Sequence, residues 1–236
     1  MTPDVRVLPD PTALSDAAAL LIESIALRAS LKEPLTLALA GGSTPKSMYQ
    51  HLAARSVPWG KVRVFFGDER CVPPDDVGSN YRMAREAMLD RVPLNPAYLH
   101  RILGELPPDE AAQRAEDDLR ANVTGDPIPR LDLIVLGIGP DGHTASLFPG
   151  GPESEVTDRL MVPVHRPDLP QPWRVSMTLP VLNAARRVVV LVADGAKAPM
   201  VARALAGDET IPAGRVRPTD GELIWMVTEA AAADLR

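Results

Sequence analysis

Short apolar segments typical of β-strands alternate along the chain with segments whose apolar residues recur at helical spacing. One strand-like segment, Leu131–Gly137, is an almost continuous apolar run, which suits a strand buried on both faces. Parallel strands need a crossover connection, usually a helix, so repeated alternation favours parallel over antiparallel pairing. The chain therefore predicts an α/β fold with a mostly parallel sheet and helices on both faces.

The same patterns give expected bounds for each element. Strands are predicted at Val5–Leu8, Leu35–Ala40, Lys61–Gly67, Leu131–Gly137, Leu160–His165, Arg174–Leu179, Arg187–Ala193 and Leu223–Thr228. Helices are predicted at Ala13–Leu31, Pro45–Ala54, Ser79–Leu89, Asp109–Ala121, Pro180–Ala185, Ala196–Ala206 and Glu229–Leu235. We see no repeat and no shift in composition that marks a boundary, so residues 1–236 are expected to form one domain.

Composition narrows the class of protein. The chain has 25 Lys and Arg against 31 Asp and Glu, and this acidic balance argues against broad nucleic-acid binding. No apolar run approaches the roughly 18–20 residues that cross a bilayer. The one cysteine, Cys71, rules out an intramolecular disulfide and a cysteine-based zinc cluster. We expect a cytoplasmic protein with no nucleic-acid or membrane partner, and among oligomeric states we favour a monomer.

Ligands of open parallel sheets bind beyond the carboxyl ends of the strands, so the loops at those ends are the candidate sites. The first such loop consists of Gly41, Gly42, Ser43 and Thr44. Its glycines allow a sharp turn, Pro45 suits the first helical position, and Ser43 or Thr44 can cap the helix. The free N–H groups of a helix start bind phosphate or carboxylate. The alternative interpretation is that this loop is an ordinary capped turn between a strand and a helix.

The second loop follows the predicted strand Lys61–Gly67 and contains Asp68, Glu69 and Arg70. An arginine can bind a phosphate or an oxyanion through its forked guanidinium, and Asp68 or Glu69 can orient it. Taken alone, a solvated surface ion cluster is the more ordinary interpretation.

The third loop, Gly137–Ser146, contains the pattern G-x-G-x-x-G and is expected to open a short helix that ends at Phe148. That helix is too short for a dinucleotide-binding unit, so we do not expect a nucleotide there. His143 is the sharper feature, because an imidazole can take and return a proton near neutral pH and Asp141 can fix its tautomer. The other histidines, His51, His100 and His165, give no metal-ligand spacing, so no metal is expected.

Arg174 begins the predicted strand Arg174–Leu179, and Lys197 lies near the start of the helix predicted after Arg187–Ala193. Both side chains can point toward the edge of the sheet where the three loops lie, although each alone is more often a surface charge.

Together these loops resemble the 6-phosphogluconolactonase family between about Leu37 and Val192. The matching segments are LALAGGSTPKSMYQHLA, VFFGDERCVPPDDVGSNYRMAREAML, LDLIVLGIGPDGHTASLFPG and RVSMTLPVLNAARRVVVLV. The resemblance implies a Rossmann-like fold shared with glucosamine-6-phosphate deaminases and ribose-5-phosphate isomerases. It also implies hydrolysis of 6-phospho-D-glucono-1,5-lactone to 6-phospho-D-gluconate, in the oxidative pentose phosphate pathway, without a cofactor.

The resemblance also implies roles for particular residues. Catalysis is expected from His143, Asp141 and Arg70, with His143 activating water and Arg70 stabilising developing charge. Substrate binding is expected from Gly41, Gly42, Ser43, Thr44, Asp68, Arg174 and Lys197. No covalent nucleophile is needed, and Ser146 lacks a G-x-S-x-G elbow around it.

Two other functions remain open from the sequence. A phosphosugar deaminase or isomerase on the same scaffold would use the same phosphate loop. The deaminases, however, carry a glutamate shortly after Asp-Gly-His, whereas here the next carboxylate is Glu153. A non-catalytic sugar-phosphate sensor fused to a DNA reader is the second alternative, but the chain has no spare length for a helix-turn-helix module.

Overall fold

The central strands are buried on both faces, as their apolar sequences predict. In the computed structural model, which describes residues 3–235, six parallel strands form one sheet in the order β1-β9-β8-β5-β2-β3. In that order they are β1 (Asp4–Leu8), β9 (Glu222–Thr228), β8 (Arg187–Val192), β5 (Leu133–Leu136), β2 (Leu35–Leu39) and β3 (Val62–Phe66). The predicted parallel sheet is therefore confirmed.

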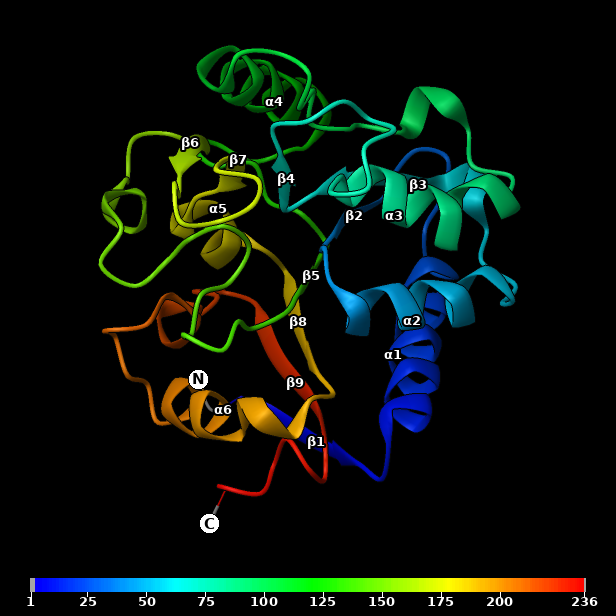
Figure 1. Cartoon of the computed structure of the whole chain (residues 1–236). Helices are drawn as coiled ribbons and strands as arrows, with labels where there is room; N and C mark the ends of the chain where they lie inside the picture. The colour runs from blue at the N-terminus through cyan, green and yellow to red at the C-terminus, as the bar shows by residue number, and fades with distance from the viewer. Residues whose placement is uncertain (1–2, 236) are drawn as a thin grey trace.

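Helices cover both sides of this sheet, as Figure 1 shows, with α1, α2 and α3 on one side and α5 and α6 on the other. The helices are α1 (Pro11–Ala26), α2 (Ser43–Ala53), α3 (Asn80–Ala87), α4 (Pro108–Asn122), α5 (Leu179–Ala184) and α6 (Ala198–Leu205). Short 3₁₀ turns lie at Trp59–Lys61, Leu89–Arg91, Pro96–Tyr98, Pro152–Glu155, Gly195–Lys197 and Pro212–Arg215. Within residues 3–235, no helix has both the length and the hydropathy needed to cross a bilayer.

A second, antiparallel sheet of three strands lies at one end of the molecule, next to α4 (Figure 1). Its strands, in spatial order, are β4 (Asp68–Arg70), β7 (Trp173–Met177) and β6 (Met161–His165). Asp68 lies opposite Ser176, and Arg70 lies opposite Arg174. Directly opposite residues of antiparallel strands share a face, so these four side chains project to the same side of the small sheet.

The strand order of the large sheet reverses between β2 and β5. From β2 the chain runs outward to β3, then returns across β2 to β5 and continues through β8 to β9. In sheets of this kind the reversal leaves a crevice at the carboxyl ends of the two strands where the order changes. The loops that follow β2 and β5 are the first and third loops singled out by the sequence, and they lie at this point of the sheet edge.

Two predicted helices outside the three candidate loops differ from the structure. The helix expected over Ala13–Leu31 ends at Ala26, and the apolar side chains beyond it are exposed, with Leu31 72% exposed. The helical spacing of apolar residues continues beyond Ala26, but these side chains have no surface to pack against. The segment Glu229–Leu235 forms turns rather than a helix, with the N–H of Ala232 donating to Thr228 O and Glu229 O. Of this segment only Ala231 is fully buried, and so small a buried face does not repay helix nucleation.

Candidate active site

The turn after β2 places free backbone donors at the carboxyl edge of the sheet. Gly42 has φ +106°, a left-handed conformation that favours glycine, and it occupies the cap position of α2. No side chain caps this helix, and α2 begins at Ser43, so the expected cap by Ser43 or Thr44 and the expected first position for Pro45 are wrong. Pro45 is the third helical residue. The N–H groups of Ser43 and Thr44 have no partner within the helix and are available to an anion.

A buried tyrosine fixes the start of this turn. The Tyr49 hydroxyl accepts the N–H of Ala40 at 2.8 Å and donates to the Ala40 carbonyl at 2.8 Å. Tyr49 is the seventh residue of α2, so the helix itself holds the residue that precedes Gly41. The sequence shows an amphipathic helix there but does not indicate this contact.

The two carboxylates of the second loop, Asp68 and Glu69, make different contacts. Glu69 is buried and accepts the backbone N–H groups of Asn80 and Tyr81 at 2.7 Å each, so it caps the start of α3. Burial raises the pKa of the Glu69 carboxyl, although these N–H groups oppose that shift. The expectation that Asp68 or Glu69 orients the Arg70 side chain is wrong, because the Arg70 guanidinium donates to Gly78 O at 2.6 Å.

Asp68 joins the three loops. Its Oδ2 accepts the Ser146 hydroxyl of the third loop at 2.7 Å, and its Oδ1 accepts the Asn80 side-chain amide at 3.1 Å. That amide lies directly against Gly41, where an added Cβ would be 2.1 Å from Asn80 Oδ1. The structure thus brings the Gly41 turn, the Asp68 strand and the loop that carries His143 into one region, as the sequence predicts.

The third loop folds as a series of turns, so the short helix expected up to Phe148 is absent. Gly139 donates its N–H to His143 O at 2.8 Å, and Gly142 donates to Gly139 O at 3.1 Å. A Cβ on Gly139 would lie 2.0 Å from His143 Nδ1, so only glycine admits the imidazole at this place. The glycine pattern therefore has a local packing cause that involves no nucleotide.

His143 and Asp141 form a hydrogen-bonded pair within this loop. His143 Nδ1 lies 2.5 Å from Asp141 Oδ1, and the His143 backbone N–H donates to the same oxygen at 3.1 Å. A carboxylate only accepts, so it selects the tautomer with the proton on Nδ1 and leaves Nε2 as a free base. Burial lowers the pKa of His143 and outweighs the opposing charges of Asp141 and Asp68. The lowered pKa favours the neutral imidazole, whose Nε2 can accept a proton.

Two arginines face the same region without carboxylate partners. Arg70 and Arg174 lie directly opposite each other on β4 and β7, an arrangement that costs free energy because like charges repel. Burial, then the charge of Arg70, lowers the pKa of Arg174, which is 7% exposed. Neither guanidinium is ion-paired with a carboxylate of residues 3–235; Arg174 Nε donates to Gln171 O at 3.4 Å. Such a pair is stabilised when an anion lies between or beside the two side chains.

A third arginine near the pair was missed by the sequence interpretation. The Arg166 guanidinium lies 4.0 Å over the Phe148 ring, and Phe148 packs against the His143 ring at 4.5 Å. Arg166 follows β6 in a hairpin, and only the pairing of β6 with β7 places it here. The sequence offers one indication of this position: Arg166 stands eight residues before Arg174, and the proline-rich segment between them is typical of a turn.

Lys197 ends the 3₁₀ turn after β8, the strand that pairs with β5. It therefore lies at the same edge of the sheet as the third loop. No contact among residues 3–235 connects its side chain to Arg174, so their shared role stays a prediction. Within the same residues, no group of three or more His, Cys, Asp or Glu side chains is placed to hold a metal ion.

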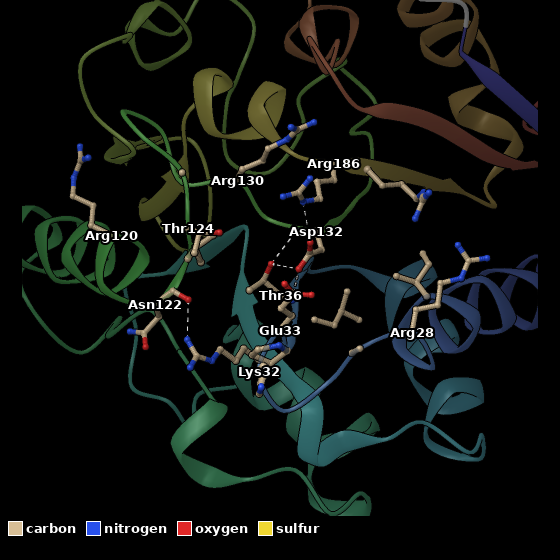
Figure 2. Close-up of a pocket in the computed structure, with 18 of the residues that line it drawn as sticks. Arg28, Lys32, Glu33, Thr36, Arg120, Asn122, Thr124, Arg130, Asp132 and Arg186 are labelled. Carbon is tan, nitrogen blue, oxygen red and sulfur yellow. Dashed lines mark hydrogen bonds and ion pairs between the residues drawn. The ribbon is translucent and has the colours of Figure 1, made fainter.

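A large hollow lies at the opposite edge of the sheet (Figure 2). It has a volume of about 1180 Å³ and is lined by residues at the amino ends of the strands, such as Thr36, Arg63 and Asp132. Thr36 donates a hydrogen bond to Asp132 there and Arg186 forms an ion pair with it, and the remaining lining contains both cationic and acidic side chains. None of the residues that the sequence singled out lines this hollow.

Known proteins resemble this chain along most of its length. The model of the family described as Glucosamine-6-phosphate isomerases/6-phosphogluconolactonase matches residues 9–225. A 6-phosphogluconolactonase of Nostoc sp. is 38% identical, with 100% of this chain and 99% of the relative covered. The solved structure of 6-phosphogluconolactonase from Trypanosoma brucei superposes with a TM-score of 0.88 at 29% identity, covering 100% and 99% of the two chains.

A monomeric glucosamine-6-phosphate deaminase superposes with a TM-score of 0.80 at 20% identity, covering 98% of this chain and 99% of that one. At that identity the likeness shows the shared fold alone.

Proposed function

Because this chain belongs to the glucosamine-6-phosphate isomerase/6-phosphogluconolactonase family, we propose that it hydrolyses 6-phospho-D-glucono-1,5-lactone to 6-phospho-D-gluconate. This is a step of the oxidative pentose phosphate pathway. The observation that carries the proposal is the hydrogen bond of 2.5 Å between His143 Nδ1 and Asp141 Oδ1, at the same edge of the sheet as the free start of α2. The full-length relative from Nostoc, named for this activity, supports the same reaction.

The phosphate of the substrate binds at the turn after β2. The backbone N–H groups of residues 42–44 and the positive end of the α2 dipole attract an anion there. Arg174 and Lys197 add positive charge around it. The lactone ring then extends toward the loop after β5, since β2 and β5 are neighbours in the sheet.

Hydrolysis begins when His143 Nε2 takes a proton from the water that attacks the C1 carbonyl carbon. The carbonyl oxygen becomes an oxyanion, which the Arg70 guanidinium stabilises. The imidazolium, held by Asp141, returns the proton to the ring oxygen as the bond between that oxygen and C1 breaks. The product is the open-chain acid, which loses its proton to solvent. General acid–base catalysis of this kind contributes a factor of roughly 10²–10⁴.

A phosphosugar deaminase is the second candidate function, because the same fold also carries that activity in other proteins. The residues Thr144 to Pro149 after His143 contain no carboxylate, and the following one, Glu153, lies in a separate 3₁₀ turn. This absence favours the lactonase, whose proposed chemistry needs one base and one oxyanion donor.

The test is an assay of 6-phosphogluconolactone loss at controlled pH, corrected for spontaneous hydrolysis, beside an assay of ammonia release from glucosamine 6-phosphate. We expect lactone hydrolysis well above the spontaneous rate and no ammonia. Ammonia release without lactone hydrolysis would replace the proposal by the deaminase, and ligand-induced thermal stabilisation without either reaction would indicate a sensor.

A further inference from the structure

The two halves of the candidate site belong to separate parts of the chain. The Gly41 turn follows β2, and His143 lies about a hundred residues later in the loop after β5. A substrate that spans both needs them at a fixed separation, because a small misplacement of reacting groups is costly to the rate. The strands β2 and β5 pair only through Leu37 with Leu133 and Ala38 with Ile134, some residues before either loop. Another contact must therefore set the distance between the loops themselves.

Asp68 and its two partners supply such a contact. Ser146, three residues after His143, donates its hydroxyl to Asp68 Oδ2 at 2.7 Å. Asn80 donates its side-chain amide to Asp68 Oδ1 at 3.1 Å and to the Asp68 carbonyl at 3.0 Å, while it lies against Gly41. All three side chains are buried, with 0%, 2% and 5% exposure for Ser146, Asn80 and Asp68.

We propose that Asn80 and Ser146 are positioning residues that hold the anion-binding turn and the His143 loop in register through the buried carboxylate of Asp68. The inference rests on the proposed function, which supplies the two ends of the substrate. It changes the expected role of Asp68 from a substrate ligand to a link between loops, because the protein already occupies an acceptor site on both of its carboxylate oxygens.

Because Asp68 is buried, the loss of either hydrogen bond to its carboxylate is costly in free energy. A buried carboxylate must have its acceptor sites filled, and removal of one donor leaves an unsatisfied oxygen that draws in water or moves a loop. Loss of the Ser146 hydroxyl releases the side that carries His143. Loss of the Asn80 side chain opens space beside Gly41 and releases the side that carries the anion-binding turn. Each variant therefore affects one end of the substrate more than the other.

A purely structural role would give a different result. If Asp68, Asn80 and Ser146 only stabilised the fold, both variants would lower the melting temperature and reduce the fraction of active enzyme. The turnover of the active fraction and its KM would then be unchanged or would change alike in both variants. The separation of kcat and KM effects distinguishes the two roles.

The experiment measures kcat and KM for 6-phosphogluconolactone in the full-length wild type and in Ser146→Ala and Asn80→Ala, well below their melting temperatures. We expect Ser146→Ala to lower kcat about tenfold with KM within about threefold, because the misplaced group is the base. We expect Asn80→Ala to raise KM about tenfold with kcat within about threefold. Thr36→Val is the matched control, since Thr36 is also buried and donates its hydroxyl to a carboxylate, Asp132 Oδ2, at 2.8 Å, but at the opposite edge of the sheet.

A double-mutant cycle adds a second readout. In an Asp68→Asn background, Ser146→Ala should lower kcat by less than about a further threefold, because Asp68 no longer links the two loops. If Ser146→Ala does not fold, Ser146→Cys replaces it, since a thiol keeps the volume and is a weaker donor.

The outcomes separate the two claims. Parallel changes of kcat and KM in both variants, or no change in either, would overturn the positioning role while the wild type remains active. A wild type without activity above the spontaneous rate would overturn the proposed function, and this inference with it.

Discussion

The substitution Asp141→Asn separates the charge of Asp141 from its shape. The carboxylate oxygen lies 2.5 Å from His143 Nδ1, and the asparagine oxygen can accept the same N–H. The change therefore keeps the tautomer and the ring orientation but removes the negative charge that stabilises the imidazolium during the reaction. Its effect measures that charge.

The size of the effect follows from distance and exposure. Two unit charges about 4 Å apart interact by about 1 kcal/mol in water and about 4 kcal/mol at an effective dielectric constant of about 20. The Asp141 side chain is 42% exposed and that of His143 26%, so the interaction lies between these limits. Taking about 2 kcal/mol, we expect kcat to fall about 30-fold at the plateau of the pH profile.

The direction in which the acid limb of the pH profile moves is an independent test of the role of Asp141. The acid limb of kcat/KM reports protonation of the free base, and burial places this limb below the ordinary histidine pKa of about 6.5. Asp141 raises the pKa of His143, so its neutralisation lowers that pKa further. The variant should thus be slower at its plateau while its acid limb moves to lower pH.

The assay follows lactone loss between about pH 5 and 8 with the spontaneous rate subtracted at each pH. Asp118→Asn is the matched control, because Asp118 pairs with His100 at 3.0 Å away from the three loops. The control should retain the wild-type profile. A plateau within twofold of wild type, or an acid limb that moves to higher pH, would refute the assigned role of Asp141.

Three further predictions concern the base, the cations and the cysteine. His143→Ala should lower kcat by about two orders of magnitude or more with KM nearly unchanged, measured by the same assay, and near-normal turnover would remove the imidazole from the mechanism. Arg174→Ala and Lys197→Ala should mainly raise KM for the phosphorylated lactone; an unchanged KM in both variants would contradict their assignment to the phosphate. Burial, then the charge of Glu69, raises the pKa of Cys71 to about 11, so iodoacetamide at pH 8 should leave activity intact, and rapid inactivation would show a reactive thiol.

The sequence was sufficient to predict the large sheet and the three loops at the carboxyl ends of its strands. Strands such as Leu133–Leu136 are apolar on both faces, which only a sheet covered on both sides explains. The rule that ligands bind at the carboxyl ends of the strands then directed attention to three loops, and these loops do meet. His143 stood out because of its chemistry and the adjacent Asp141, both of which are local features.

Features that depend on long-range pairing were not predictable. The strand Asp68–Arg70 is short and wholly charged, so nothing in its sequence indicates a strand, and the pairing of Arg70 with Arg174 exists only through it. Asn80 was expected near the start of a helix, but its contact with Gly41 depends on how α3 packs against the turn. The helix expected at Glu229–Leu235 failed because periodicity alone does not show whether an apolar face has a partner.

The central claim is that one substrate spans the turn after β2 and the imidazole of His143. A crystal structure of the protein with bound 6-phosphogluconate tests this most directly. We predict the phosphate on the backbone N–H groups of residues 42–44 and the C1 carboxylate within hydrogen-bond distance of His143 Nε2. A phosphate bound in the hollow at the opposite edge of the sheet, or a C1 carboxylate remote from His143, would contradict the account.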